Sequence, residues 1–280
     1  MISRRQFTTF SLASAAIGPV RAAITPEDDP FPPLPADLAG AEGEEDFFSL
    51  QLMQQELGTA DPGRQKREFA KEILNKAPKN CRPIDVASYF RNLGLGKTEF
   101  GEEGRPYARG WPRLYNPLII EFFEATKTRP LSPGGLGDAT PWCAAFVNFC
   151  IARAASKTGN IGAEELKRST NHASSGSFRC FGKPVPDDKA PAYGDLAVWA
   201  LEGSIDGCKY GSGHVGFVVG PSGDARMPYL VLGGNQGGDL LNGALTRRDG
   251  VIQKKMPDKY LATKKPPRYK VIYGYRTAYF

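Results

Sequence analysis

The sequence predicts an α+β fold in which helices come first and an antiparallel sheet follows. Apolar residues recur at helical spacing between residues 47 and 155, whereas short runs of β-branched, leucine and aromatic residues dominate after residue 193. Glycine, aspartate or proline bounds each of these later runs, as expected for strands joined by turns. With 280 residues and no internal repeat, the chain is long enough for one large domain with a helical extension.

The first 22 residues resemble a bacterial twin-arginine export signal. Arg4 and Arg5 precede a modest apolar segment rich in serine, threonine and alanine, and "VRA" at 20–22 offers a signal peptidase small or apolar residues. The alternative is a basic amphipathic helix. Export predicts a location in the periplasm or cell envelope of a bacterium. No apolar stretch reaches transmembrane length, so we expect no membrane insertion after signal removal.

Residues 23–46 are predicted to be a disordered leader, because they carry several prolines, eight acids and no base. Residues 47–280 consequently have a formal net charge of +11. A basic body suits an anionic polymer of the envelope, although the charge could serve solubility alone. No nucleic-acid-binding motif is present, so we expect no nucleic acid partner.

Helices are expected at 47–58, 64–77, 83–94 and 116–126 from apolar spacing and from breaks at proline and glycine. We assign 47–115 to a helical N-terminal region and 116–280 to the main domain. Strands are expected at 194–201, 214–220, 229–235 and 269–278, after a long polar stretch at 156–192.

The segment "TPWCAAFVNFCIARAA" (140–155) predicts a buried helix with a cysteine in its first turn. Thr140 is a favourable N-cap and Pro141 suits the first helical position, which makes Cys143 about the third helical residue. The helix dipole should favour the thiolate and lower the Cys143 pKa, and free first-turn N–H groups can bind an oxyanion. Cys143 is therefore a candidate nucleophile. Core packing and disulfide formation are the alternatives.

The chain has five cysteines, an odd number, so one thiol would remain after pairing in an oxidising compartment. A bridge between Cys143 and Cys150 is excluded in a regular helix, since seven residues span about 10.5 Å. Cys180 could pair with Cys208, and Cys81 with Cys150, but the sequence leaves the connectivity open. The scattered cysteines and two histidines offer no zinc spacing, so we expect no metal or cofactor.

A nucleophilic thiol needs a base, and the chain offers two histidines. His214 begins the run "HVGFVVG" beside glycines, whereas His172 lies in a polar loop and is expected to be solvated. Asn235, at the tip of "VLGGN", could orient the His214 ring, and Gln236 is the neighbouring alternative. Asp195 is a further polar group at a strand start, although turn formation is the favoured explanation for it.

Six segments then point to a known family. "NPLIIEFFEAT", "GDATPWCAAFVNF", "GDLAVW", "GHVGFVVG", "VLGGNQ" and "VIYGYR" follow the order found in CHAP-like amidohydrolase and peptidase proteins, which are part of the NlpC-type, papain-like cysteine peptidase superfamily. The resemblance spans about 116–276. It implies a papain-like core, with a nucleophile-bearing helix on an antiparallel sheet, and cleavage of amide bonds in the stem peptides of peptidoglycan.

The resemblance also implies roles for individual residues. Cys143 matches the nucleophile, His214 the base and Asn235 the polar third residue. Gln236, Trp142 and Asp195 are then accessory or substrate-binding candidates.

The chain departs from the family pattern in three insertions: 156–192, the segment "EGSIDGCKYGSG", and the run before the last strand. Such loops would wall the cleft and affect which amide bond is cut. Two other functions remain open, namely a transglutaminase-like cysteine acyltransferase and a cell-wall-binding protein without activity.

Overall fold

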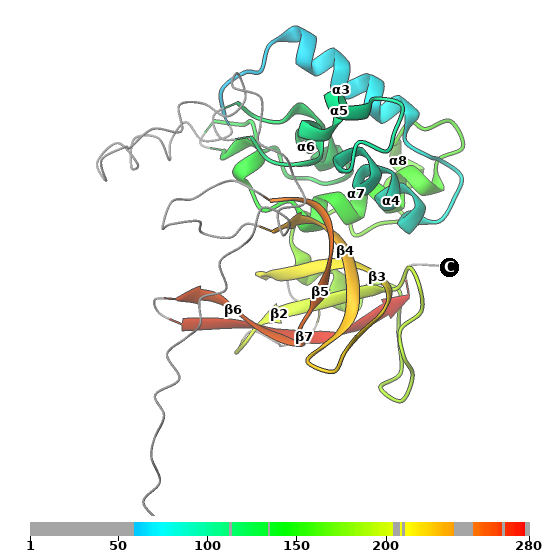
Figure 1. The fold of residues 1–280 in the computed structure, drawn as a ribbon, viewed down its shortest axis with the longest axis vertical. Helices are drawn as coiled ribbons and strands as arrows, with labels where there is room; N and C mark the ends of the chain where they lie inside the picture. The colour runs from blue at the N-terminus through cyan, green and yellow to red at the C-terminus, as the bar shows by residue number, and fades with distance from the viewer. Residues whose placement is uncertain are drawn as a thin grey trace, which may run out of the picture.

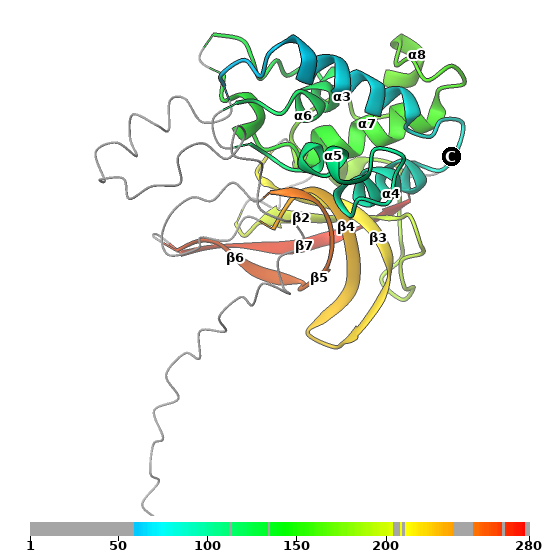
Figure 2. The ribbon, with the colours of Figure 1, turned by 45° about the horizontal axis from the view of Figure 1, so that its top comes forward.

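The computed structural model describes residues 59–111, 114–133, 135–203, 208, 211–237, 249–264 and 267–277. In these ranges, a layer of helices lies over one face of a curved antiparallel sheet (Figures 1 and 2). The predicted α+β class is confirmed. The expected export signal, the acidic leader and the helix at 47–58 lie outside the described residues.

The helical layer contains six α-helices among the described residues and several 3₁₀ turns. They are α3 (Arg64–Lys76), α4 (Pro83–Gly94), α5 (Gly101–Gly104), η2 (Arg105–Ala108), α6 (Pro117–Phe122), η3 (Phe123–Ala125), η4 (Gly137–Ala139), α7 (Cys143–Ala155), α8 (Ala163–Leu166) and η5 (Ser175–Cys180). The helices expected at 64–77, 83–94 and 116–126 are present, the last one ending in the turn η3. Proline occupies the first position of α4 and α6, where its missing N–H has no cost.

The sheet has the strand order β1-β7-β2-β3-β4-β5, and β6 pairs with β7. Its strands are β1 (Lys183–Pro184), β2 (Leu196–Leu201), β3 (Gly213–Asp224), β4 (Met227–Gln236), β5 (Gly250–Met256), β6 (Lys259–Lys264) and β7 (Pro267–Thr277). The four predicted strands correspond to β2, β3, β4 and β7. The sequence did not predict β5 and β6, whose lysines interrupt the apolar runs typical of strands.

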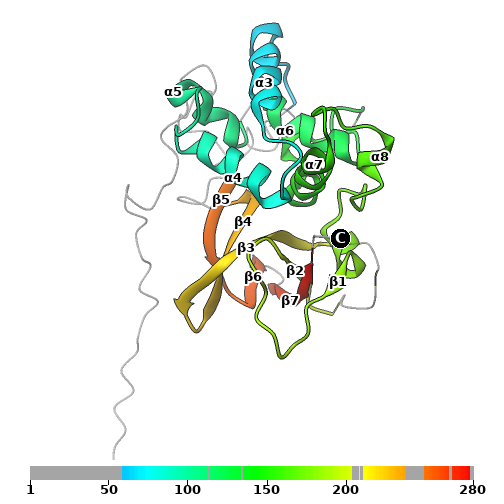
Figure 3. The same cartoon turned by 90° about the vertical axis from the view of Figure 1, so that its right-hand side faces the viewer.

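Both faces of the sheet are covered near β2, where every residue is buried. Leu196 and Val198 pack into the large core under the helices. Ala197 and Trp199 face the other way and join a smaller cluster with Met256 of β5. Figure 3 shows that the sheet is strongly curved beneath the helices.

Helix α7 lies at the centre of the molecule, and its residues from Cys143 to Ala154 are all buried. It approaches β4 so closely that a Cβ on Gly234 would lie 2.4 Å from the Trp142 ring and 2.8 Å from Phe146 Cβ. Only glycine fits there. On its other side, Phe146 packs against Phe90 of α4 with ring centroids 6.1 Å apart, so the N-terminal helices share one core with α7.

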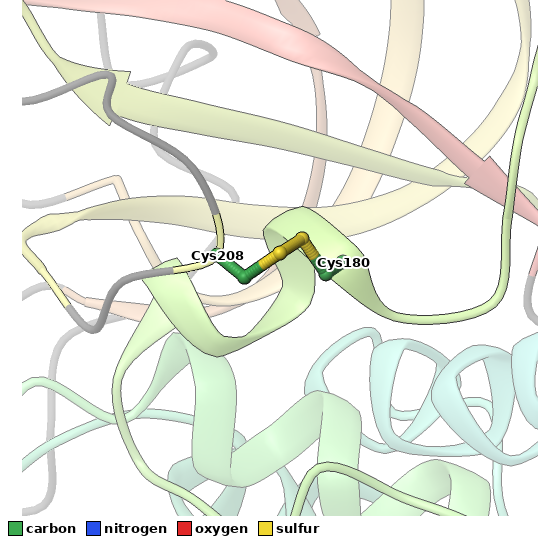
Figure 4. Close-up of a disulfide and its surroundings, with 2 residues drawn as sticks. All are labelled: Cys180 and Cys208. Carbon is green, nitrogen blue, oxygen red and sulfur yellow. A yellow bond between two sulfur atoms is a disulfide. The ribbon is translucent and has the colours of Figure 1, made fainter.

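Cys180 and Cys208 form a disulfide that joins η5 to the segment before β3 (Figure 4). Their Cα atoms lie 5.2 Å apart, as a bridge requires. Cys81, Cys143 and Cys150 are free thiols, so the second candidate bridge, between Cys81 and Cys150, is not formed. The N–H of Cys81 donates to the Ala154 carbonyl, which fixes its backbone one turn beyond Cys150.

Candidate active site

Helix α7 begins at Cys143, so its N-cap is Trp142 and not Thr140 as predicted. The Thr140 N–H instead donates to the Gly137 carbonyl and closes the turn η4. The first helical hydrogen bond runs from the Phe146 N–H to the Trp142 carbonyl, at 2.9 Å. Cys143 is therefore the first helical residue, still in the turn whose N–H groups have no helical partners.

The approach to this helix is held by a buried carboxylate. Asp138, in η4, accepts hydrogen bonds from the backbone N–H groups of Trp111 at 3.2 Å and Asn116 at 2.9 Å. The Trp142 ring packs against Phe122 with centroids 6.0 Å apart. These contacts fix the chain on both sides of the turn that presents Cys143.

A cavity of about 640 Å³ opens between the start of α7 and the sheet. The starts of α7 and β3, the end of β4, parts of β5, β6 and β7, and the chain on either side of the disulfide line it. Its lining residues are Thr128, Thr140, Pro141, Cys143, Ala173, Ser174, Ser175, Gly211, Ser212, Gly213, His214, Asn235, Gln236, Gly237, Asp249, Lys254, Met256, Tyr260, Leu261 and Lys270. The structure thus brings together both residues of the predicted Cys-His pair and both candidates for the third position.

The wall beside the disulfide is held by α7 itself. The side chain of Asn148 accepts a hydrogen bond from the Thr170 N–H and donates one to the His172 carbonyl, both at 2.9 Å. Further along, the Ser174 hydroxyl bonds the Gly211 backbone, donating to its carbonyl at 2.8 Å and accepting from its N–H at 2.9 Å. The helix that carries the thiol therefore also holds the loop that supplies Ala173, Ser174 and Ser175 to the cavity lining.

His214 lies near the start of β3 with only 5% of its surface exposed. It pairs with Trp199 of β2, and the two rings lie 5.8 Å apart. Burial, followed by the positive charges of Lys270 and Lys254, lowers the pKa of His214 well below its ordinary value of 6.5. Its imidazole is therefore neutral at neutral pH. No described residue makes a hydrogen bond to the Nε2 atom.

Burial also raises the pKa of the Cys143 thiol, which is 5% exposed. The Lys270 charge and hydrogen bonds from the backbone of Val215, Ala144 and Cys143 itself lower it, but by less. The prediction of a lowered pKa is therefore wrong in its net direction, because desolvation outweighs the helix terminus. The predicted donors are nevertheless in place, and Val215 ties the thiol to the strand that carries His214.

Asn235 and Gln236, the two candidates for orienting the His214 ring, differ in backbone conformation and in side-chain contacts. Asn235 has a positive φ of 57°, at an irregularity of the β4–β5 pairing. The side chain of Gln236 is 2% exposed, donates to the Ile252 carbonyl at 3.1 Å and raises the pKa of His214. That contact falls short of normal hydrogen-bond geometry, since Gln236 Oε1 has no partner among the described residues. A Cβ on Gly233 would lie 2.4 Å from Gln236 Nε2, so glycine leaves the space for this side chain.

Three other residues singled out from the sequence lie outside the cavity lining. Trp142 is fully buried between helices and β4 and serves packing. Asp195 closes the turn before β2, where its Oδ2 accepts the Ala192 N–H at 2.7 Å. His172 is half-buried in its loop, and its Nδ1 accepts the Ser174 N–H at 3.1 Å.

Sequence reasoning missed Lys254, Tyr260 and Lys270, which line the cavity from β5, β6 and β7. The signal for Lys254 and Tyr260 was the lysine-rich composition of the insertion before the last strand, whereas Lys270 lies in that strand itself. Composition does not show which lysines face inward, because strand register decides that. In the described residues, no group of three or more His, Cys, Asp or Glu side chains could hold a metal ion. No described helix is long and apolar enough to cross a membrane.

The model of the CHAP domain family matches residues 135–235. The resemblance to CHAP-like cysteine amidohydrolases is thereby confirmed for this segment, which contains Cys143 and His214 and ends at Asn235. The match indicates peptidoglycan hydrolase activity in general terms and leaves the bond open. Neither the curated proteins nor the solved structures include a match to the chain.

Proposed function

We propose that this protein is a cysteine amidase or endopeptidase that cleaves an amide bond in the stem peptides of peptidoglycan. The observation that carries the proposal is the convergence of Cys143 and His214 on one cavity, together with a His214 Nε2 atom that has no hydrogen-bond partner among the described residues. A buried imidazole nitrogen without a partner costs stability, which is typical of a group that serves chemistry. The helix-on-sheet arrangement is compatible with a papain-like core.

In the proposed reaction, His214 takes the thiol proton as Cys143 attacks the amide carbonyl carbon. A bond forms between the Cys143 sulfur and the carbonyl carbon, and the carbonyl oxygen becomes an oxyanion. His214 then gives its proton to the leaving amine as the carbon–nitrogen bond breaks, which leaves a thioester. Water, activated by neutral His214, hydrolyses the thioester and restores the thiol.

The oxyanion would be held where α7 begins. The backbone N–H groups of Cys143 and Ala144 already interact with the Cys143 sulfur, so they point at the reacting atoms. Donors aimed at a developing negative charge in a buried site are worth more than in water. Gln236 is the residue that we favour to orient the His214 ring, with Asn235 as the family-based alternative.

The resting pair is neutral, since burial raises the pKa of Cys143 and lowers that of His214. Proton transfer from sulfur to imidazole therefore accompanies attack rather than preceding it. This differs from a pre-formed ion pair, which a lowered thiol pKa would have produced.

The test is mass spectrometry of the fragments released from purified sacculi. The wild-type protein is expected to release muropeptides with a new amine, and their masses identify the bond. The Cys143→Ala and His214→Ala variants are expected to release none while retaining the wild-type circular dichroism spectrum. Full release by Cys143→Ala would end the assignment.

The same experiment separates the two alternative functions. Cross-linked products in place of new amines would indicate a transglutaminase-like acyltransferase. Retention on sacculi without any product would indicate a wall-binding protein.

We further propose export through the twin-arginine signal at 1–22 to the periplasm or cell envelope. Fusing these residues to a reporter that is active only after export tests this, and replacing both Arg4 and Arg5 with lysine should prevent transport. Transport that persists in this double variant would contradict the twin-arginine route.

A further inference from the structure

Two lysines reach the cavity from β5 and β7, strands that are not neighbours in the sheet. Lys254 lies on β5, where it pairs with Val231 of β4, and Lys270 lies on β7, where it pairs with Tyr260 of β6. Both side chains line the cavity that holds Cys143 and His214. Asp249 is the one acidic residue in the described lining, so the cavity wall carries an excess of positive charge.

Lys270 is positioned by an aromatic neighbour. Its Nζ atom lies 5.9 Å from the centroid of the Tyr260 ring, within the range of a cation–π contact. Burial raises the pKa of Tyr260, so its ring stays a neutral phenol at all working pH values. A charge held against a partly buried ring is better placed to meet a ligand than a lysine that moves freely at the surface.

These charges oppose the reaction in the empty site. His214 must become an imidazolium when it takes the thiol proton, and the charges of Lys270 and Lys254 both disfavour that cation. Lys270 partly offsets this effect, because its charge also favours the Cys143 thiolate. Lys254 is not among the groups that lower the pKa of Cys143, so its charge only opposes the proton transfer. A bound negative charge between the lysines would remove this opposition, because opposite charges at short range cancel each other's field.

We propose that Lys254 and Lys270 form a subsite for a carboxylate of the substrate, so that the preferred scissile amide lies beside a free carboxylate. The inference rests on the proposed amide cleavage and specifies its substrate class. The carboxylate can come from the side chain of an acidic residue or from the C-terminus of a stem peptide. Either carboxylate would bind the same two lysines. By offsetting their charge, it would make protonation of His214 more favourable.

The experiment uses three synthetic stem peptides with the same scissile bond. In the first peptide all carboxylates are free. In the second the acidic side chain is converted to a carboxamide, and in the third the C-terminal carboxylate is converted to a carboxamide. The wild-type protein is expected to lose roughly tenfold or more in kcat/KM on the one carboxamide that removes the bound charge. The loss should appear in KM, because the ion pairs with the lysines are gone, and in kcat, because both lysine charges again disfavour protonation of His214. The peptide that shows the loss identifies the source.

Variants test whether the lysines cause this preference. Lys254→Gln and Lys270→Gln should each reduce the ratio of free-carboxylate to carboxamide kcat/KM, whereas Lys254→Arg and Lys270→Arg should keep it. Lys255→Gln is the matched control, because this residue neighbours Lys254 on β5 and is exposed as Lys254 is, but does not line the cavity. A ratio that is unchanged in both glutamine variants would overturn the proposal, as would a wild-type ratio of one.

Binding measurements on an inactive variant show whether the carboxylate subsite or the proposed amide cleavage is wrong. The Cys143→Ala protein, titrated with the same peptides by calorimetry, should bind the free-carboxylate peptide about tenfold more tightly, and Lys270→Gln in that background should abolish the difference. If no peptide is cleaved by the wild-type protein but this binding preference is present, the subsite stands and the amidase proposal falls. Equal binding of all three peptides would reject the subsite itself.

Discussion

Helix α7 carries one cysteine at its start and a second near its middle, and their surroundings differ. Cys143 at the start and Cys150 two turns later are both buried, and burial raises the pKa of both thiols. Backbone hydrogen bonds and the Lys270 charge counteract burial at Cys143, whereas the second influence on Cys150 is Cys81, which raises its pKa further. The cavity, the hydrogen-bond donors and an imidazole lining the same cavity therefore distinguish a candidate nucleophile from a core thiol, whereas burial does not.

The largest expected effect is the loss of activity when the Cys143 thiol is removed, compared with removal of the Cys150 thiol. We expect Cys143→Ala to lower the rate of sacculus solubilisation by about 10⁴-fold or more, because the covalent step is lost. Cys150→Ala should leave the rate within about twofold and lower the free energy of unfolding by about 1–2 kcal/mol through the small cavity it creates. Turbidity assays and urea denaturation measure the two quantities. Comparable activity loss in both variants would remove the distinction.

A smaller effect should separate the two candidates for orienting His214. Gln236→Met removes the amide at similar volume and should lower kcat/KM roughly 10- to 100-fold, mostly through kcat. Asn235→Gly is the matched change, since glycine tolerates the positive φ and only the side chain is lost. We expect little change in that variant. If the order of the two losses is reversed, Asn235 holds the ring, as the family resemblance implies.

Alkylation should show that the two thiols differ in access and that Cys143 rests as a thiol. Because its pKa lies above the ordinary 9.0, labelling by iodoacetamide should rise about tenfold per pH unit from pH 6 to pH 9. Peptide mass spectrometry follows each cysteine, and Cys150 should stay unlabelled in the folded protein. A Cys143 rate that is already maximal at pH 6 would mean that the site holds a pre-formed ion pair.

The smallest effect expected is a pH dependence of stability from His214. Its folded pKa lies below 6.5, so the unfolded chain binds this proton first and stability falls as pH drops below about 6.5. The contribution should reach at most about 1.4 kcal/mol per pH unit and vanish above that range. Denaturation of wild type and His214→Gln between pH 5 and 8 should show a shallower slope in the variant. Equal slopes would mean that burial does not depress this pKa.

Local patterns predicted the elements whose sequence signal agrees with their environment. Pro83 marks the start of α4, and the apolar runs around Val198 and Val218 become strands because both faces of the sheet there are covered. Strands β5 and β6 escaped prediction because lysines interrupt their apolar runs in the sequence, and their pairing with β4 and β7 is decided by the tertiary fold.

The sequence predicted two residues that line one cavity, but not the details of this candidate site. Cys143 and His214 follow from residue type and motif order. The direction of the Cys143 pKa depends on how deeply the helix terminus is buried, which no local pattern reports. Asn235 and Gln236 both line the cavity, and the positive φ of Asn235 and the irregular pairing there depend on the tertiary fold, which no motif reports. Lys254 and Lys270 line one cavity from β5 and β7, which are not neighbours in the sheet, so only the tertiary fold places them there.

The bridge between Cys180 and Cys208 sets a practical condition for handling the protein. It ties the segment that supplies Ser174 to the one that supplies Gly211, so the mouth of the cavity depends on an oxidised pair exposed at the surface. Dithiothreitol, the usual additive for keeping a nucleophilic sulfur unmodified during purification, would also cut this tie. Preparations should therefore be made in an oxidising expression host and stored without reductant under inert gas.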